Sequence, residues 1–132
     1  MLFVDTSFLV GLALRNDSNH ERATTLRDRL ERERVCTSEL VRGEVWTLLR
    51  KRVGHRPAVE WVDRVRALDR ARIEHVDAEL AGDAWRWLRV RDERPYSFVD
   101  STSFAVMRRR GITEALAFDG NFAAAGFTEL RA

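Results

Sequence analysis

Four acidic residues at the edges of apolar segments are the positions in this sequence that could carry out chemistry. Asp5 follows the apolar run 2–4, and Asp119 follows the apolar run 115–118. If both runs are strands of an open parallel sheet, both carboxylates lie at strand carboxyl ends, where such sheets bind ligands. Taken singly, each is better explained as a turn or cap residue, because Asp is common at such turns.

Glu44 is harder to explain as a structural residue. Leu40, Glu44 and Leu48 recur at i, i+4 and i+8, which predicts that Glu44 lies in the core-facing stripe of a helix. A buried carboxylate must be protonated, pair with a cation or bind a metal, because burying it unpaired is costly. A buried Glu–Arg pair is the alternative, since the chain is rich in arginine.

Asp100 is expected in the first turn of another helix, where the helix dipole favours a negative charge. Ser97 stands three residues earlier, and the pair has the spacing of a capping box. Capping alone would explain Asp100, but it also shares a helix face with Phe104 and Met107. Its carboxylate is therefore expected to point towards the packed side.

These acids suggest one metal-binding pocket. Carboxylates gathered in one place repel and raise one another's pKa values, a penalty that a divalent cation removes. Ligation by oxygen alone selects Mg²⁺ or Mn²⁺ rather than zinc. Such ions can activate water and stabilise the leaving oxygen of a phosphodiester. The residues alone thus support the hypothesis of a metal-dependent nuclease.

The elements that must position these residues alternate along the chain as in a parallel α/β sheet. The expected strands are residues 2–4, 35–36, 72–76, 115–118 and 127–130. The expected helices are residues 6–14 (capped by Thr6 or Ser7), 20–34, 38–53 (capped by Thr37 or Ser38), 58–68, 78–91 (capped by Asp77) and 97–110. Gly111 suits the end of the last of these.

Length and composition narrow the possible classes of protein. The 132 residues fit a single domain, 1–132, with no repeat or linker, and 45% hydrophobic residues suffice for a core. Cys36 is the only cysteine, which excludes an internal disulfide and a multi-cysteine zinc site. Asp5 interrupts the apolar start, and no basic leader precedes it, so we expect a cytoplasmic protein without a membrane partner.

Four stretches of the sequence resemble the PIN-domain family, and especially the toxins of VapBC toxin–antitoxin pairs. They are residues 3–7 (FVDTS), 37–44 (TSELVRGE), 97–101 (SFVDS) continuing to 109–112 (RRGI), and 117–122 (AFDGNF). Each motif is weak alone, but the four follow the family's order and spacing over essentially the whole chain.

The resemblance implies a three-layer α/β/α sandwich with a five-stranded parallel sheet. It implies that Asp5, Glu44, Asp100 and Asp119 hold Mg²⁺, with Mn²⁺ as a substitute, and that Thr6 supports the site. It further implies an endoribonuclease that leaves a 3′-hydroxyl and a 5′-phosphate. The expected partners are an RNA substrate, a second copy in a homodimer, and a VapB-type antitoxin that blocks the site.

Other functions fit the sequence less well. A phosphatase with an aspartyl nucleophile would carry Asp-x-Asp after its first strand, whereas Thr6 and Ser7 follow Asp5. A response-regulator receiver would need a late-chain lysine, which is missing. An inactive PIN-like module that binds RNA or serves a structural role remains the main alternative, although the intact acidic quartet argues against it.

The arginines near the expected site have two possible interpretations. Arg86, Arg89, Arg91, Arg94 and the run 108–110 could hold RNA phosphates, which would make RNA binding salt-dependent. A solvated charged face is the more frequent explanation for such a run.

Overall fold

Five short strands form one parallel sheet in the computed structural model, which describes residues 1–132. The strand order is β3-β2-β1-β4-β5, and each neighbouring pair is parallel. The strands are β1 (Leu2–Val4), β2 (Val35–Ser38), β3 (Ala71–Glu74), β4 (Glu114–Leu116) and β5 (Thr128–Glu129).

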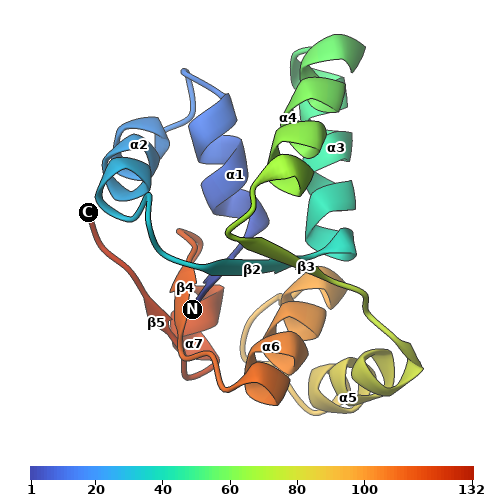
Figure 1. The fold of residues 1–132 in the computed structure, drawn as a ribbon. Coiled ribbons are helices and arrows are strands. Elements are labelled where there is room, and N and C mark those ends of the chain that lie inside the picture. The colour runs from blue at the N-terminus through green and yellow to red at the C-terminus, as the bar shows by residue number, and fades with distance from the viewer.

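Helices cover both faces of this sheet, as Figure 1 shows: α1 to α4 lie on one side and α5 to α7 on the other. They are α1 (Thr6–Ala13), α2 (His20–Arg29), α3 (Glu39–Arg52), α4 (His55–Ala67), α5 (Ala78–Arg89), α6 (Phe98–Arg110) and α7 (Asn121–Ala124). The predicted three-layer α/β/α sandwich with a five-stranded parallel sheet is therefore confirmed.

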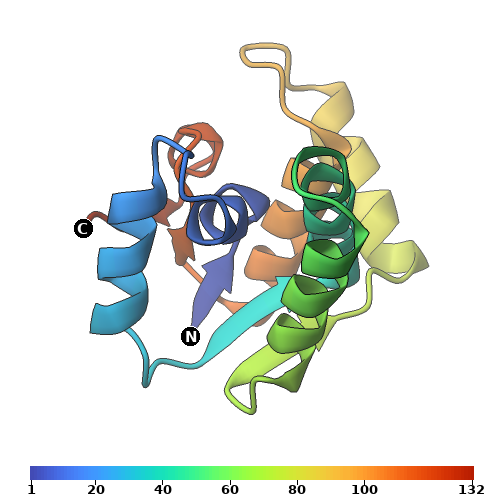
Figure 2. The same cartoon turned by 90° about the horizontal axis from the view of Figure 1, so that it is seen from above.

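The chain reverses its direction of travel across the sheet next to β1. It moves outward from β1 to β2 and β3, then returns to the other side of β1 to form β4 and β5. Figure 2, a view turned by 90°, shows β1 running into α1 at this central position. In open α/β sheets the crevice at such a switch point is where ligands bind.

The core explains why β1 is central. Leu2, Phe3 and Val4 are all buried, as expected for a parallel strand covered on both faces. On the α6 side, Phe122 contacts both Phe3 and Phe104, with ring centroids 6.0 and 4.9 Å away. This packing fixes β1, α6 and α7 relative to one another, and acidic residues lie beside all three.

Several predicted helix boundaries were wrong by a few residues. The second helix ends at Arg29 rather than at residue 34, because residues 31–34 are exposed and no burial stabilises a further turn. The fourth starts at His55 rather than at residue 58, since Pro57 falls in the first turn, where its missing N–H is not needed. The fifth ends at Arg89 rather than at residue 91.

The strands also differ from the prediction at their ends. β2 is longer than predicted because all four of its residues pair with β3. The ends of β3, β4 and β5 differ from the predicted ends by one or two residues, and because β4 stops at Leu116, Asp119 lies beyond the strand rather than directly after it. None of the helices has the length and apolar character that a membrane-spanning helix needs.

Candidate active site

The four acids predicted from the sequence line one cavity of about 220 Å³ at the switch point of the sheet. They come from four separate places in the chain: the end of β1, the middle of α3, the first turn of α6 and the loop after β4. The cavity is lined by Asp5, Thr6, Ser7, Val10, Asp17, Asn19, Glu44, Leu48, Asp100 and Asp119.

Asp5 directly follows β1 and is 2% exposed. Its Oδ2 accepts hydrogen bonds from the backbone N–H of Ser7, at 3.2 Å, and from the Ser7 hydroxyl, at 2.7 Å. Asp5 is therefore the N-cap of α1, not Thr6 or Ser7 as predicted, because its carboxylate satisfies a free N–H of the first turn. Its other oxygen, Oδ1, accepts no hydrogen bond from the protein.

Ser7 links the two strands that meet at the switch point. Its Oγ donates to Asp5 and accepts from the backbone N–H of Phe118, at 3.0 Å, just before Asp119. From its position in the sequence, Ser7 is expected only as a helix cap. Nothing in the sequence pattern reveals that its hydroxyl reaches a loop 111 residues away.

Asp100 is buried in the first turn of α6 and forms the predicted capping box with Ser97. Ser97 Oγ accepts from the Asp100 N–H at 2.9 Å, and Asp100 Oδ2 accepts from the Ser97 N–H at 3.0 Å. The same Oδ2 accepts a third bond from Asn121 Nδ2 at 3.0 Å. Asn121, which no sequence argument singled out, is the first residue of α7.

Glu44 lies on the flank of α3 rather than in its core-facing stripe. The residues that α3 buries are Val41, Val45 and Leu49, whereas Glu44 and its stripe neighbour Leu48 are half-buried and line the cavity. The stripe prediction was wrong because the buried face is rotated by one residue. Glu44 makes no ion pair or hydrogen bond, so the alternative of a Glu–Arg pair does not apply.

Asp119 is the most exposed of the four acids. Its Oδ1 accepts from the backbone N–H of Asn121 at 3.0 Å, and its carbonyl accepts from Arg94 Nη2 at 3.2 Å. Glu129, on β5, stabilises the loop that follows Asp119, because its carboxylate accepts hydrogen bonds from the N–H groups of Gly120 and Ala123. Asp119 is thus held by its neighbours rather than by a strand.

The electrostatics couple these carboxylates. Burial, followed by the charges of Asp119 and Asp100, raises the pKa of Asp5 from 3.8 to about 7, although hydrogen bonds from Ser7 act in the opposite direction. Burial also raises the pKa of Asp100, and the charges of Asp119 and Glu44 add to that effect. Each acid of the quartet therefore takes part in a mutual repulsion that a cation would relieve.

The donor set fits a divalent ion that keeps part of its water shell. No three His, Cys, Asp or Glu side chains are close enough to hold an ion by themselves, whereas Mg²⁺ usually retains several waters. Thr6 Oγ1 is buried without a hydrogen-bond partner, although Thr6 lines the cavity. Because buried hydroxyls are normally hydrogen-bonded, Thr6 Oγ1 is available to a water molecule or a ligand in the cavity. The acids supply only oxygen, the ligand type that Mg²⁺ and Mn²⁺ prefer.

Asp17 and Asn19 complete the rim of the cavity, although neither is expected at the site from the sequence. Both precede α2, and Asp17 Oδ1 accepts from the Asn19 N–H at 2.8 Å. They fall in a polar stretch between two helices, which in sequence has the appearance of an ordinary turn.

Both the sequence and the fold are similar to those of known proteins. The family model for the PIN domain matches residues 2–128. The 23S rRNA-specific endonuclease VapC20 of Mycobacterium tuberculosis, from strains CDC 1551 and H37Rv, is 52% identical over 131 residues, which are 99% of this chain and 98% of the relative. The crystal structure of Mycobacterium tuberculosis VapC20, described as a toxin that cleaves the sarcin–ricin loop, matches with a TM-score of 0.94 and 50% identity over 100% of both chains.

Proposed function

Because the chain belongs to the PIN-domain family, as its motifs predicted, we propose that it is a metal-dependent endoribonuclease and the toxin of a VapBC pair. Its proposed substrate is the sarcin–ricin loop of 23S ribosomal RNA, the target of the relative with which it shares half its residues. The observation that carries the proposal is the convergence of Asp5, Glu44, Asp100 and Asp119 on one cavity.

In this proposal the four carboxylates hold Mg²⁺, or Mn²⁺ in its place, partly through waters of its hydration shell, since no three of them are close enough to hold it directly. When bound, the ion would polarise water and the scissile phosphate for hydrolysis. Asp5 is positioned by Ser7, which engages its Oδ2 and leaves Oδ1 for the cavity. Thr6 Oγ1, which lacks a protein partner, would orient a water molecule or a phosphate oxygen.

The test is cleavage of a synthetic sarcin–ricin stem-loop and of intact large ribosomal subunits, with the cut ends mapped. We expect a single cut that leaves a 5′-phosphate, dependent on Mg²⁺ or Mn²⁺ and abolished by chelation. Asp5→Asn should lower the rate by roughly three orders of magnitude, as for other members of a catalytic set. Asp28→Asn removes an equal charge from an exposed site on α2 and should leave the rate unchanged.

Two results would reject the proposal: full activity of Asp5→Asn, or full activity with all divalent metal chelated. RNA binding without cleavage under every metal condition would instead favour the inactive PIN-like module.

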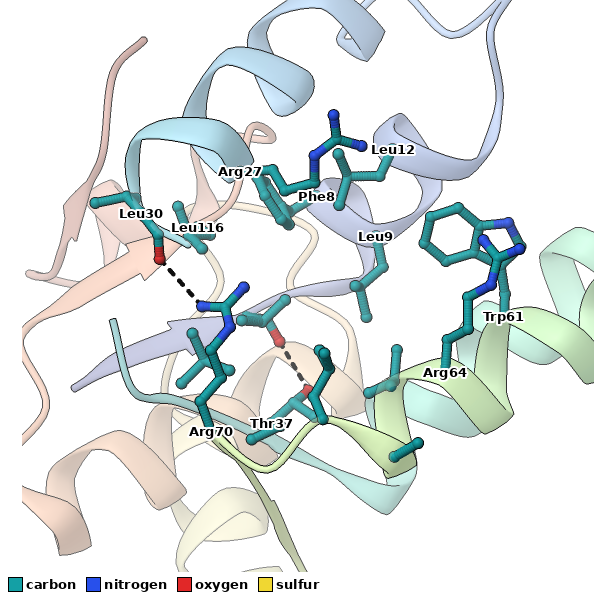
Figure 3. Close-up of a pocket in the computed structure, with 16 residues that line it drawn as sticks. Phe8, Leu9, Leu12, Arg27, Leu30, Thr37, Trp61, Arg64, Arg70 and Leu116 are labelled. Atoms are coloured by element: carbon teal, nitrogen blue, oxygen red, sulfur yellow. Dashed lines mark hydrogen bonds between the residues drawn. The ribbon is translucent and has the colours of Figure 1, made fainter. Parts of the chain in front are cut away.

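A second cavity suggests where the antitoxin binds. This apolar groove of about 480 Å³ lies between α1, α2, α4 and the sheet, and Figure 3 shows Phe8, Leu9, Leu12 and Trp61 facing into it. Arg27 and Arg64 are exposed beside it, and Arg64 lies over the Trp61 ring. We propose that an amphipathic helix of the antitoxin binds here, with acidic residues that pair with these arginines.

We also propose that residues 1–132 form one domain that assembles as a homodimer. The sheet contains strands from both ends of the chain, β1 and β5, so neither end can be removed without losing a strand. The homodimer is proposed from the family resemblance, and light scattering of the purified protein would test it.

A further inference from the structure

The loop that carries Asp119 needs support from outside the sheet. It lies beyond the end of β4, and Gly120 within it has a φ of 81°, in the left-handed region that favours glycine. If Asp119 helps to hold an ion, as the proposed function requires, something must keep its carboxylate at a fixed place relative to Asp100.

Arg94 supplies a contact of that kind. It lies in the connection between α5 and α6, far from Asp119 in sequence. Its Nε donates to Asn121 Oδ1 at 2.9 Å, and its Nη2 donates to the Asp119 carbonyl at 3.2 Å. The guanidinium also lies directly over Gly120, where an added Cβ would come within 3.2 Å of Nη2.

Asn121 passes this restraint to Asp100. A guanidinium can only donate, so the Asn121 amide must turn its oxygen towards Arg94 and its NH₂ towards Asp100. The NH₂ group donates to Asp100 Oδ2 at 3.0 Å, while the Asn121 N–H donates to Asp119 Oδ1 at 3.0 Å. One residue thus contacts two of the four acids, and Arg94 sets its orientation.

Arg94 differs in this from the other arginines nearby. Arg86 pairs with Asp83 on its own helix, and Arg91 pairs with Glu93. Arg89 makes no ion pair or side-chain hydrogen bond. Of the arginines on α5 and the connection after it, only Arg94 contacts the residues around the cavity.

We infer that Arg94 is a positioning residue that acts through Asn121 to fix Asp100 and Asp119 for metal binding. The inference rests on the proposed function of the site. Residues that orient metal ligands in this way typically change metal affinity by about 10- to 100-fold when they are removed.

The test is titration of the RNA-free protein with Mn²⁺ by calorimetry. We expect Arg94→Ala to weaken Mn²⁺ binding about tenfold with little change in melting temperature, because the side chain is exposed. The Mn²⁺ affinity of Arg94→Lys should lie between those of the unaltered protein and Arg94→Ala, since one ammonium group cannot reproduce the two hydrogen bonds of the guanidinium. Arg89→Ala, a matched loss of charge on the neighbouring helix, should leave Mn²⁺ affinity unchanged.

A double-mutant cycle separates this role from direct contact with RNA. Because Asn121 carries the restraint from Arg94 to Asp100, the double variant Arg94→Ala with Asn121→Ala should bind Mn²⁺ only slightly more weakly than Asn121→Ala alone, the difference coming from the Arg94 contact with the Asp119 carbonyl. If the losses of Mn²⁺ affinity in the two single variants multiply in the double variant, the inference is overturned. Unchanged Mn²⁺ affinity in Arg94→Ala accompanied by a higher KM for RNA and a smaller salt dependence would also overturn it.

The same titration distinguishes failure of this inference from failure of the proposed function. If the unaltered protein binds no Mn²⁺, the metal-dependent function is rejected and the inference falls with it. If the unaltered protein and Arg94→Ala bind Mn²⁺ equally well, only the role of Arg94 is rejected.

Discussion

Asp5 combines deep burial with two acidic neighbours, and both features oppose its ionisation. In the absence of a cation its pKa is about 7, so the folded protein holds a proton that the unfolded chain releases near pH 4. Proton and metal therefore compete for this side chain. Metal binding at neutral pH and below is expected to release a proton.

This competition predicts how the stability of the metal-free protein depends on pH. Between about pH 4 and 7 the folded state binds more protons than the unfolded state, so the free energy of unfolding falls as pH rises, by up to about 1.4 kcal/mol per pH unit from Asp5. Asp100 contributes in the same direction, since its pKa is also raised. Urea unfolding in metal-free buffer at pH 5, 6 and 7 would measure this slope.

Asp5→Asn provides the control, because an amide does not titrate. The variant should lose much of the slope and be more stable than the unaltered protein at pH 7 without metal. Saturating Mn²⁺ should stabilise the unaltered protein more at pH 7 than at pH 5. A flat profile in metal-free buffer would show that Asp5 does not retain its proton on folding.

At the scale of the element, α6 places Asp100 through its first turn. The Ser97 hydroxyl accepts a hydrogen bond from the Asp100 N–H, and Ser97→Ala removes this half of the capping box. The other half remains, because the backbone N–H of residue 97 still donates to the Asp100 carboxylate. We expect a loss of about 1 kcal/mol in the free energy of unfolding. We also expect slower RNA cleavage under conditions where the protein remains folded, because Asp100 loses part of its support.

Asp77→Ala is a suitable comparison for Ser97→Ala. Asp77 caps α5 by accepting the Leu80 N–H at 2.8 Å, and α5 contributes no residue to the cavity. This variant should be destabilised but cleave RNA at the normal rate. Equal losses of cleavage in both variants would mean that the effect of Ser97→Ala reflects stability alone.

The sequence predicted elements well where local chemistry sets them. The α6 start at Ser97, its end at Gly111 and the caps of α3 and α5 are all as predicted, since each depends on residues within one turn. Strand ends and the buried face of α3 were less well predicted. Pairing with a neighbouring strand and packing against a second helix decide those features, and neither is visible in one segment.

The same distinction applies to the site. The convergence of the four acids on one cavity could be expected for Asp5 and Asp119, which follow apolar runs, and for Asp100, which lies at a cap. Glu44 also lines the cavity, but the core-facing position predicted for it was wrong. The supporting contacts of Ser7, Arg94 and Asn121 could not be predicted, because each reaches residues distant in sequence. Their side chains look ordinary until the fold brings the partners together.

At the scale of the whole molecule, α1 separates the two cavities. Phe8, Leu9 and Leu12 face the apolar groove, whereas Thr6 and Val10 face the acidic cavity. A helix bound in the groove would therefore contact the element whose first residues form the proposed active site. An antitoxin segment that continues beyond α1 could reach the carboxylates.

The groove can be tested with a purified VapB-type antitoxin as the binding partner. Trp61→Ala removes a large apolar surface from the groove and should weaken binding by about tenfold or more, as buried aromatic anchors do. Trp85→Ala is the matched control, because Trp85 is 52% exposed on α5, on the other face of the sheet. Equal effects of the two substitutions, or none from either, would reject this docking site.

The bridge made by Ser7 has a consequence for the direction of its hydrogen bonds. The Ser7 hydroxyl accepts from the Phe118 N–H and has Asp5 Oδ2 as its one acceptor, and the same Oδ2 also accepts from the Ser7 N–H, so the hydroxyl hydrogen points at Oδ2. That oxygen is permanently an acceptor, and any proton on Asp5 must reside on Oδ1. The two donors of one serine thereby dictate which of two chemically identical atoms can exchange hydrogen for a metal ion.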